Sequence, residues 1–336
     1  MWRTGSHRLP LHAVMSDADG VHVVVGASGG TGSALVRELV DRGRRVRAVN
    51  RSGRMAVPAG VEVMAADATD AQRMREVCRG AGVVYNAVNV PFLQWRESFP
   101  AAIDGVLSGA RAADARMVFV DDTWMYGRVS DPMTEDLPYR PVSNKGVLRA
   151  WLAERVLAAH TSGQVRTVIG RAPELYGPGV ESVLGRNLFG AAMGRTPALW
   201  VGDMDQPLGP MFIGDFAHGL ADLGEHESSP GRAWHIPTPP PTTARAFLRE
   251  LFARAHRRSA VLRLGPTTAR ALGLTWPVLR EGAEMLYQFR QPHSVDAAAY
   301  RATIGAGRVT PYTDGIEATL RWYRDGASRS LSALGR

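Results

Sequence analysis

Three glycines spaced three residues apart could bind a phosphate-containing ligand. Gly26, Gly29 and Gly32 follow the apolar run Val21–Val25 and lead directly into a helical pattern. Gly26 permits a sharp turn, Gly29 lets the backbone approach a phosphate, and Gly32 lets the helix lie close to the strand. Because free N–H groups at a helix start favour an anion, this order predicts a dinucleotide pyrophosphate site; the alternative is a turn that binds no ligand. The residues assigned to the turn are Gly26, Ser28, Gly29, Gly30, Thr31 and Gly32.

The end of the second predicted strand indicates which dinucleotide would bind. An acidic residue there would bind a ribose 2′-hydroxyl and favour NAD, but the segment Ala48–Arg54 contains no carboxylate. Arg51 and Arg54 are placed to bind a 2′-phosphate, so we expect NADP, with NAD as the alternative. These two arginines could also be ordinary loop charges in an arginine-rich chain. Further residues expected at the dinucleotide are Asn50, Asp67, Ala68, Asn86, Ala87 and Val88.

Two carboxylates could act as an acid and a base. Asp122 follows the fifth predicted strand and Glu174 follows the sixth. Both lie at carboxyl ends of strands, where open α/β sheets bind their ligands. Such a pair can transfer protons if burial separates the two pKa values. Tyr126 is expected at the same edge, and the structural alternatives are a turn cap for Asp122 and an arginine partner for Glu174.

Alternating strands and helices must position these groups. The predicted strands are 21–25, 45–50, 61–65, 82–88, 116–120 and 165–171, and helices follow the first strand and lie near 70–79, 97–114 and 142–160. This rhythm predicts an α/β fold with a Rossmann-type, doubly wound parallel sheet. The apolar residues expected on the buried face of the last helix are Val147, Leu148, Trp151, Leu152, Val156 and Leu157.

Proline-rich segments interrupt this rhythm after Tyr176. We expect a disordered extension over 1–20, with Met15 as an alternative start, an NAD(P)-binding Rossmann domain over 21–175, and a smaller, irregular C-terminal substrate lobe over 176–330. Part of that lobe is allowed to return to the sheet. Its predicted helices lie near 182–193, 215–223, 243–256, 266–287 and 313–324.

Composition narrows the class of protein. The chain has 336 residues, 45% of them hydrophobic and 21% charged, which is typical of a soluble globular protein. Scattered arginines dominate the net charge of +8, which favours anionic small molecules, and we expect neither a nucleic-acid nor a membrane partner. One cysteine, Cys78, fits a reducing cytoplasm. The nine histidines show no metal-ligand spacing, so we expect no metal site.

Taken together, the motifs resemble the extended short-chain dehydrogenase/reductase superfamily, in its branch of NAD(P)-dependent epimerases and dehydratases. The resemblance covers most of the chain and implies chemistry at a carbonyl or carbinol carbon. It also implies a homodimer through the helices near 97–114 and 142–160. The matching segments are Gly26–Gly32, Asp67, Asn86–Ala87, Met125–Gly127, Arg171, Tyr176–Gly179 and Phe212–Ala217.

The catalytic positions that the resemblance implies are only partly kept. The family uses a Ser or Thr, a Tyr and a Lys, with the Tyr four residues before the Lys. Lys145, the only lysine of the chain, matches and would bind the nicotinamide ribose, but Pro141 stands at the tyrosine position. Asp122 stands at the Ser/Thr position, with Thr123 one residue away. Tyr139 could bring a phenol to the same place or pack at the lobe interface, so the chain is predicted to be an atypical member.

Three functions follow as alternatives. The first is an NADP-dependent oxidoreductase or epimerase acting on a small organic molecule, with proton transfer by Tyr139, Tyr126 or Asp122. The second keeps the fold without redox chemistry and uses Asp122 and Glu174 as acid and base in a dehydration, isomerisation or cyclisation. The third is a regulator that binds the dinucleotide and a protein partner without catalysis.

Overall fold

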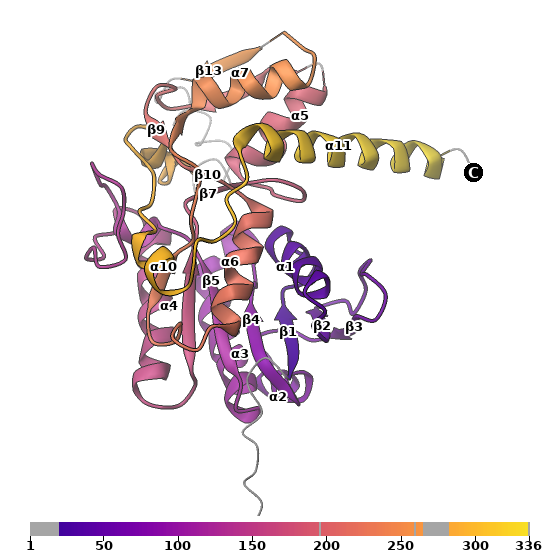
Figure 1. Cartoon of the computed structure of the whole chain (residues 1–336), viewed down its shortest axis with the longest axis vertical. Coiled ribbons are helices and arrows are strands. Elements are labelled where there is room, and N and C mark those ends of the chain that lie inside the picture. The colour runs from indigo at the N-terminus through magenta and orange to yellow at the C-terminus, as the bar shows by residue number, and fades with distance from the viewer. Residues whose placement is uncertain (1–19, 195, 259, 265–281, 335–336) are drawn as a thin grey trace, which may run out of the picture.

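A computed structural model describes residues 20–194, 196–258, 260–264 and 282–334. Its centre is a seven-stranded sheet in the order β11-β6-β5-β4-β1-β2-β3, and all neighbouring strands run parallel (Figure 1). The strand order changes direction between β1 and β4, and an open α/β sheet binds its ligand at such a point. The strands are β1 (Val21–Val25), β2 (Val46–Asn50), β3 (Glu62–Ala65), β4 (Ala81–Asn86), β5 (Arg116–Asp121), β6 (Thr167–Arg171) and β11 (Ala233–His235).

Helices cover both faces of the sheet, which explains the apolar character of the central strands. On one face lie α1 (Gly30–Asp41) and α6 (Ile213–Glu225), whose apolar residues share a core with β1, β2 and β4. On the other face lie α2 (Ala71–Val77), α3 (Trp95–Ala112) and α4 (Asn144–Thr161). The two cores enclose the sheet between two layers of helix (Figure 1).

The chain returns to the sheet after Phe212. Helix α6 packs against α1, and β11 pairs in parallel with β6 at the edge of the sheet. The sequence motif Phe212–Ala217 therefore lies at the start of α6, a helix that packs against the central sheet. This return brings His235 beside Arg171 at the carboxyl edge of the sheet.

A second group of elements lies beyond the carboxyl ends of the strands (Figure 1). It has its own aromatic core, in which Tyr176, Phe189 and Phe247 pack together. It contains two short pairs of parallel strands, β7 with β10 and β8 with β13. Its elements are β7 (Glu174–Tyr176), α5 (Leu188–Met193), β8 (Ala198–Val201), β10 (Pro210–Phe212), α7 (Ala244–Arg254), β13 (Val261–Leu264) and α11 (Tyr312–Leu334), whereas α10 (Ala298–Thr303) packs beside the sheet, near β11 and α6.

The predicted doubly wound α/β fold is confirmed, and the six predicted strands agree with the structure to within two residues at each end. The predicted extension lies outside the described residues apart from Gly20, as does most of the predicted helix 266–287. The division of the chain at residue 175 stays a prediction. One expectation about α4 is wrong: Val147 is 55% exposed and Trp151 is 43% exposed, because the apolar stripe of this helix is wider than the face that the sheet covers.

Candidate dinucleotide and substrate site

The glycine turn has the geometry that a diphosphate requires. Gly26 has a φ of +84°, and a Cβ there would lie 2.4 Å from the Ala87 carbonyl oxygen. A Cβ on Gly32 would lie 2.3 Å from the Gly26 carbonyl oxygen, so only glycine lets α1 approach β1 this closely. A Cβ on Gly29 would meet only the Gly26 oxygen, at 3.5 Å. Helix α1 begins after Gly29 with no side-chain cap and no acidic residue in its first turn. These observations fit an anion at the helix start.

The turn after β2 is built by Asn50. Its side-chain oxygen accepts hydrogen bonds from the Gly53 backbone N–H at 2.7 Å and from the Ser52 hydroxyl at 3.1 Å. Its amide nitrogen donates to the Arg54 carbonyl oxygen at 3.2 Å. Arg51 and Arg54 are both exposed on this turn. The turn therefore offers two guanidinium groups and no carboxylate at the end of the strand.

Neighbouring strand ends complete this edge of the sheet. The Asp67 carboxylate accepts from the backbone N–H and the hydroxyl of Thr69, and these two bonds hold the pKa of Asp67 below its usual value. The Asn86 side chain, after β4, accepts from the Val88 N–H at 3.2 Å. Ala68 and Ala87 are buried, and Ala87 donates its N–H to Val25. The polar groups expected at the adenosine and the diphosphate thus lie at the carboxyl ends of β2, β3 and β4, beside the glycine turn that follows β1.

Lys145 lies buried in the first turn of α4 and faces a carboxylate from the C-terminal part of the chain. Its Nζ is 3.7 Å from Glu284 Oε1. The same carboxylate accepts from the backbone N–H groups of Asn144 and Lys145, so it caps the helix as well. The Nζ also lies 6.0 Å from the ring centroid of Trp95. The ammonium is therefore held at the carboxyl edge of the sheet, between α4 and the start of α3.

Arg171 organises a buried cluster at the end of β6. Its Nε donates to Asp121 at 3.1 Å, and its two terminal nitrogens each donate to a phenol oxygen at 2.5 Å, of Tyr126 and of Tyr139. The Tyr126 hydroxyl also bonds to His235 Nε2 at 2.9 Å. Burial raises the pKa of Tyr126 and lowers the pKa of His235 to about 3. The hydroxyls of both tyrosines that the sequence offered as proton donors are thus engaged inside this cluster.

Asp122 lies next to this cluster and pairs with α4. Its carboxylate accepts from the Trp124 N–H at 2.9 Å and lies 2.9 Å from Arg149 Nε. The Arg149 guanidinium also stacks over the Trp95 ring at 4.6 Å. Burial, partly opposed by Arg149, raises the pKa of Asp122 to about 6. Asp122 therefore caps a turn, as one interpretation of the sequence held, and also holds an ion pair.

Thr123 is buried beside a histidine that the sequence analysis did not select. Its hydroxyl lies 3.2 Å from His293 Nε2, and both side chains are 1% exposed. Burial lowers the pKa of His293 to about 4, so this imidazole is neutral at pH 7. Within the described residues, His293 Nδ1 has no hydrogen-bond partner. Thr123 therefore faces a neutral imidazole rather than a tyrosine.

Glu174 lies at the start of β7, and a glutamine connects it to the end of β5. Gln288 receives the Trp124 indole N–H at 3.1 Å and points its amide nitrogen at Glu174 Oε2, 3.5 Å away. Burial raises the pKa of Glu174 to about 7, and the Asp122 charge adds to this rise. The structure thus brings Asp122, Thr123 and Glu174 to one edge of the sheet, with Lys145 on the adjoining helix.

Three residues of this edge, Glu284, Gln288 and His293, were not predicted because they come from a segment 114 to 170 positions away from their partners in sequence. The segment carries no glycine or acidic motif that would mark it. Only its short run of polar and aromatic residues before Pro292, Tyr287-Gln288-Phe289-Arg290-Gln291, could have drawn attention.

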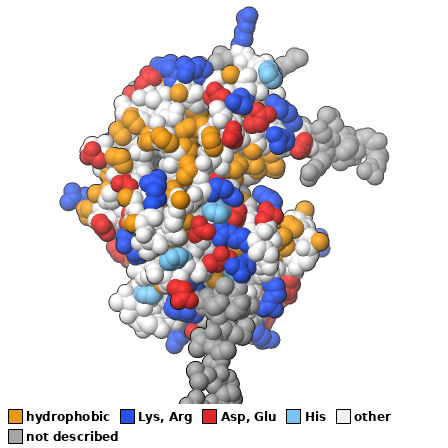
Figure 2. Space-filling view, viewed as in Figure 1, with side chains coloured by type: hydrophobic (Ala, Val, Ile, Leu, Met, Phe, Trp, Pro, Cys, Tyr) orange, Lys and Arg blue, Asp and Glu red, His pale blue; other side chains and the backbone are white. Residues whose placement is uncertain are grey.

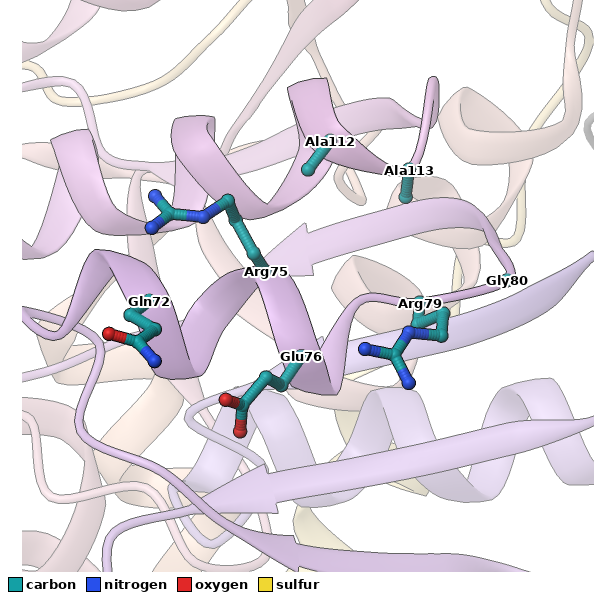
Figure 3. Close-up of a pocket in the computed structure, with 7 residues that line it drawn as sticks. All are labelled: Gln72, Arg75, Glu76, Arg79, Gly80, Ala112 and Ala113. Carbon is teal, nitrogen blue, oxygen red and sulfur yellow. The ribbon is translucent and has the colours of Figure 1, made fainter.

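One surface pocket lies at the edge of the sheet opposite the candidate site. A shallow pocket lined by Arg75, Glu76, Arg79 and Ala113 lies between the ends of α2 and α3 (Figure 3). Its lining includes Gly80, directly before β4, so this pocket lies at the amino-terminal edge of the sheet, opposite the glycine turn. On the face in Figure 2, blue and red side chains are interspersed over the surface.

No helix among the described residues is long and apolar enough to span a membrane. The same residues contain no group of three or more metal-binding side chains.

The fold and this edge define a dinucleotide-dependent enzyme of Rossmann type. The model of the NAD dependent epimerase/dehydratase family matches residues 22–236, which is well over half of the chain. The chain therefore belongs to this family, and it is an enzyme with NAD(P)-dependent chemistry.

Individual relatives differ in their activities. A 2-alkyl-3-oxoalkanoate reductase of Stenotrophomonas maltophilia is 27% identical over 279 residues, covering 77% of this chain and 84% of the relative. The dTDP-glucose 4,6-dehydratase of Streptomyces venezuelae, solved with NAD, has a TM-score of 0.75 at 20% identity and covers 91% of this chain and 97% of its own. The UDP-glucuronic acid 4-epimerase of Bacillus cereus, also with NAD, has a TM-score of 0.74 at 17% identity, covering 91% and 99%. These structures share the fold.

Proposed function

We propose that this protein is an NADP-dependent oxidoreductase that acts on a carbonyl or hydroxyl carbon of a small organic molecule. The observation that carries the proposal is the shared edge of the sheet. The glycine turn, the Lys145 ammonium, the partly exposed carboxyl of Asp122 and the buried carboxyl of Glu174 all lie at the carboxyl ends of the strands, where an open α/β sheet binds its ligand. The curated relative named as a reductase of a 3-oxo acid supports reduction of a ketone over sugar chemistry.

Separate groups of this chain would hold separate parts of the dinucleotide. The N–H groups after Gly29 would bind the diphosphate, Arg51 and Arg54 the 2′-phosphate, and Lys145 the ribose hydroxyls beside the reactive ring. When bound, NADP(H) supplies the hydride donor or acceptor. The stacked rings of Trp95 and Trp124, with centroids 5.5 Å apart, would form an apolar wall beside Lys145 that shields a bound dinucleotide from water.

The test of this function is an assay of the purified chain with NADPH and a series of 3-oxo esters and simple ketones. We expect NADPH oxidation that depends on the ketone and yields the secondary alcohol. No consumption of NADPH with any carbonyl compound, combined with no binding of NADPH, would remove the proposal.

Removing the two turn arginines should reduce the preference of the enzyme for NADPH over NADH. We expect the double variant Arg51→Ala/Arg54→Ala to lose about 10- to 100-fold in kcat/KM for NADPH, since a hydrogen bond to a charged group contributes about 1.5–3 kcal/mol. The value for NADH should change little. Steady-state kinetics with both dinucleotides measures this, and Arg111→Ala, an exposed arginine at the end of α3, is the matched control. Equal losses for NADPH and NADH would contradict the assignment.

A second function is favoured by the two carboxyls. Because burial raises the pKa of Glu174 to about 7 and of Asp122 to about 6, the pair offers an acid and a base near neutral pH. The enzyme would then catalyse a dehydration, isomerisation or cyclisation without net redox change. Activity that survives removal of the dinucleotide would favour this function over the first.

The pH dependence of this second function follows from Glu174. A protonated Glu174 acting as the acid is lost as the pH rises through about 7, so kcat should fall above that pH. Glu174→Gln should remove this descending limb from the pH–rate profile along with most of the activity. A profile with the same limb in the variant would show that another group titrates.

We also propose a homodimer through α3 and α4. Val147 and Trp151, four residues apart on α4, are 55% and 43% exposed, and they form an apolar strip that a second copy would cover. Light scattering after size exclusion should give twice the mass of one chain, and the mass of a single chain would refute the dimer.

A further inference from the structure

The family tyrosine is replaced by proline at position 141, and the two nearby tyrosines are engaged elsewhere. The hydroxyls of Tyr126 and Tyr139 both accept from Arg171, which also holds the buried Asp121. To take a proton from either phenol, a substrate would have to reach the fully buried Arg171 guanidinium. A reduction of the proposed kind nevertheless needs a proton for the new alkoxide oxygen.

A third phenol reaches the same place from the C-terminal part of the chain. Tyr287 lies in the short 3-10 helix Leu286–Phe289, is 5% exposed, and donates its hydroxyl to the Trp124 carbonyl oxygen at 3.4 Å. That carbonyl faces the first turn of α4: a Cβ on Gly146 would lie 2.6 Å from it and 3.0 Å from Pro141 Cβ. The Tyr287 hydroxyl therefore lies against the turn where the family tyrosine would stand.

The neighbours of Tyr287 in sequence fix it there. Glu284 caps α4 and lies 3.7 Å from Lys145 Nζ, and Gln288 bonds to the Trp124 indole and approaches Glu174. Three successive contacts of one short segment thus run from the lysine, through the phenol, to the buried carboxyl.

The Tyr287 side chain also borders open space. It lines a surface pocket together with Val142, Glu284 and Arg290, and the Arg128 guanidinium lies 5.8 Å from its ring centroid. Burial, with the charges of Asp122 and Glu284, raises the pKa of Tyr287. The phenol is therefore a weak acid that is protonated at neutral pH, and it can transfer its proton only to a strongly basic oxygen such as the alkoxide formed in a ketone reduction.

We propose that Tyr287 is the catalytic acid of this enzyme and replaces the family tyrosine from a different part of the chain. The inference rests on the proposed reductase function. In the reduction, the ketone carbon would accept a hydride, which a bound reduced dinucleotide would supply, and the carbonyl π electrons would move to oxygen. That oxygen takes the Tyr287 proton, and the phenolate regains a proton from solvent. The dinucleotide is oxidised and the ketone is reduced to an alcohol.

The experiment compares Tyr287→Phe with Tyr312→Phe, which removes a phenol of the distant lobe that donates to Pro240. Reduction of ethyl acetoacetate and other 3-oxo esters is assayed, and NADPH binding is measured by fluorescence titration. We expect Tyr287→Phe to lose about 10²- to 10⁴-fold in kcat, the usual contribution of a general acid. Its dissociation constant for NADPH and its melting temperature should match those of Tyr312→Phe.

Chemical rescue separates proton donation from packing. Tyr287→Gly leaves space for a ring, so added phenol should restore part of the lost kcat and added toluene should not. If Tyr287→Phe keeps kcat within threefold, or if toluene rescues as well as phenol does, the proposal is overturned. The two failures can be told apart. If the unmodified chain neither binds NADPH nor reduces any ketone, the proposed function itself is wrong, whatever the variants do.

Discussion

Replacing Gly29 with valine is expected to abolish binding of NADPH while leaving the fold intact. A Cβ at Gly29 meets only one protein atom within 4 Å, the Gly26 oxygen at 3.5 Å, so the side chain does not disturb the packing of the turn. It does occupy the approach to the uncapped start of α1. Losing two charge-assisted hydrogen bonds, each contributing about 1.5–3 kcal/mol, weakens binding by at least about 100-fold. Fluorescence titration with NADPH measures the loss.

A neighbouring glycine gives the matched control for this prediction. Gly32→Ala places a Cβ 2.3 Å from the Gly26 carbonyl oxygen, so it should lower the melting temperature by separating α1 from β1. Gly29→Val should melt close to the unmodified chain. If Gly29→Val binds NADPH within threefold of the unmodified chain, the diphosphate does not lie at this turn.

The largest loss of stability is expected from Arg171→Met. Arg171 is fully buried and holds the carboxylate of Asp121 and the hydroxyls of Tyr126 and Tyr139. Without it, Arg149, at 3.5 Å, is the one cation still paired with the carboxylate among the described residues, and two phenols lose their donor. Breaking a buried ion pair on one side costs about 3–5 kcal/mol. Urea denaturation measures the free energy of unfolding.

An exposed ion pair supplies the comparison for Arg171. Arg245 pairs with Asp205 at 2.7 Å, and both side chains are more than half exposed. Arg245→Met should therefore change the free energy of unfolding only marginally, since solvent screens such pairs. Equal effects of the two variants would show that the Arg171 cluster contributes little to stability.

Much of the fold was predictable because its signals are local. Except for His22 and Asn86, the runs Val21–Val25 and Gly82–Val88 are apolar, as is typical of buried parallel strands, and the glycines after the first run fix the turn and the start of α1. Asp122 and Glu174 were found for the same reason: each follows directly after a predicted strand. The parallel sheet then brings strand ends together whatever their separation in sequence.

The rest of the site depends on long-range packing that no local pattern encodes. Glu284, Tyr287 and His293 reach Lys145, Trp124 and Thr123 only because the chain after residue 282 folds back over the carboxyl edge. The hydrogen bond from Arg171 to Tyr139 could not be predicted for the same reason, since the two residues are 32 positions apart in sequence. The exposure of Val147 and Trp151 is a second example of this limit. An apolar stripe on a helix does not tell how much of that stripe is covered by the sheet of the same chain.

Calorimetric titration of NADPH into the unmodified chain, repeated with Lys145→Met, tests the central claim most directly. The account predicts one site per chain with micromolar affinity for the unmodified protein, and clearly weaker binding once the buried ammonium at the start of α4 is gone. No heat of binding at millimolar NADPH, or equal affinity of the two proteins, would contradict it.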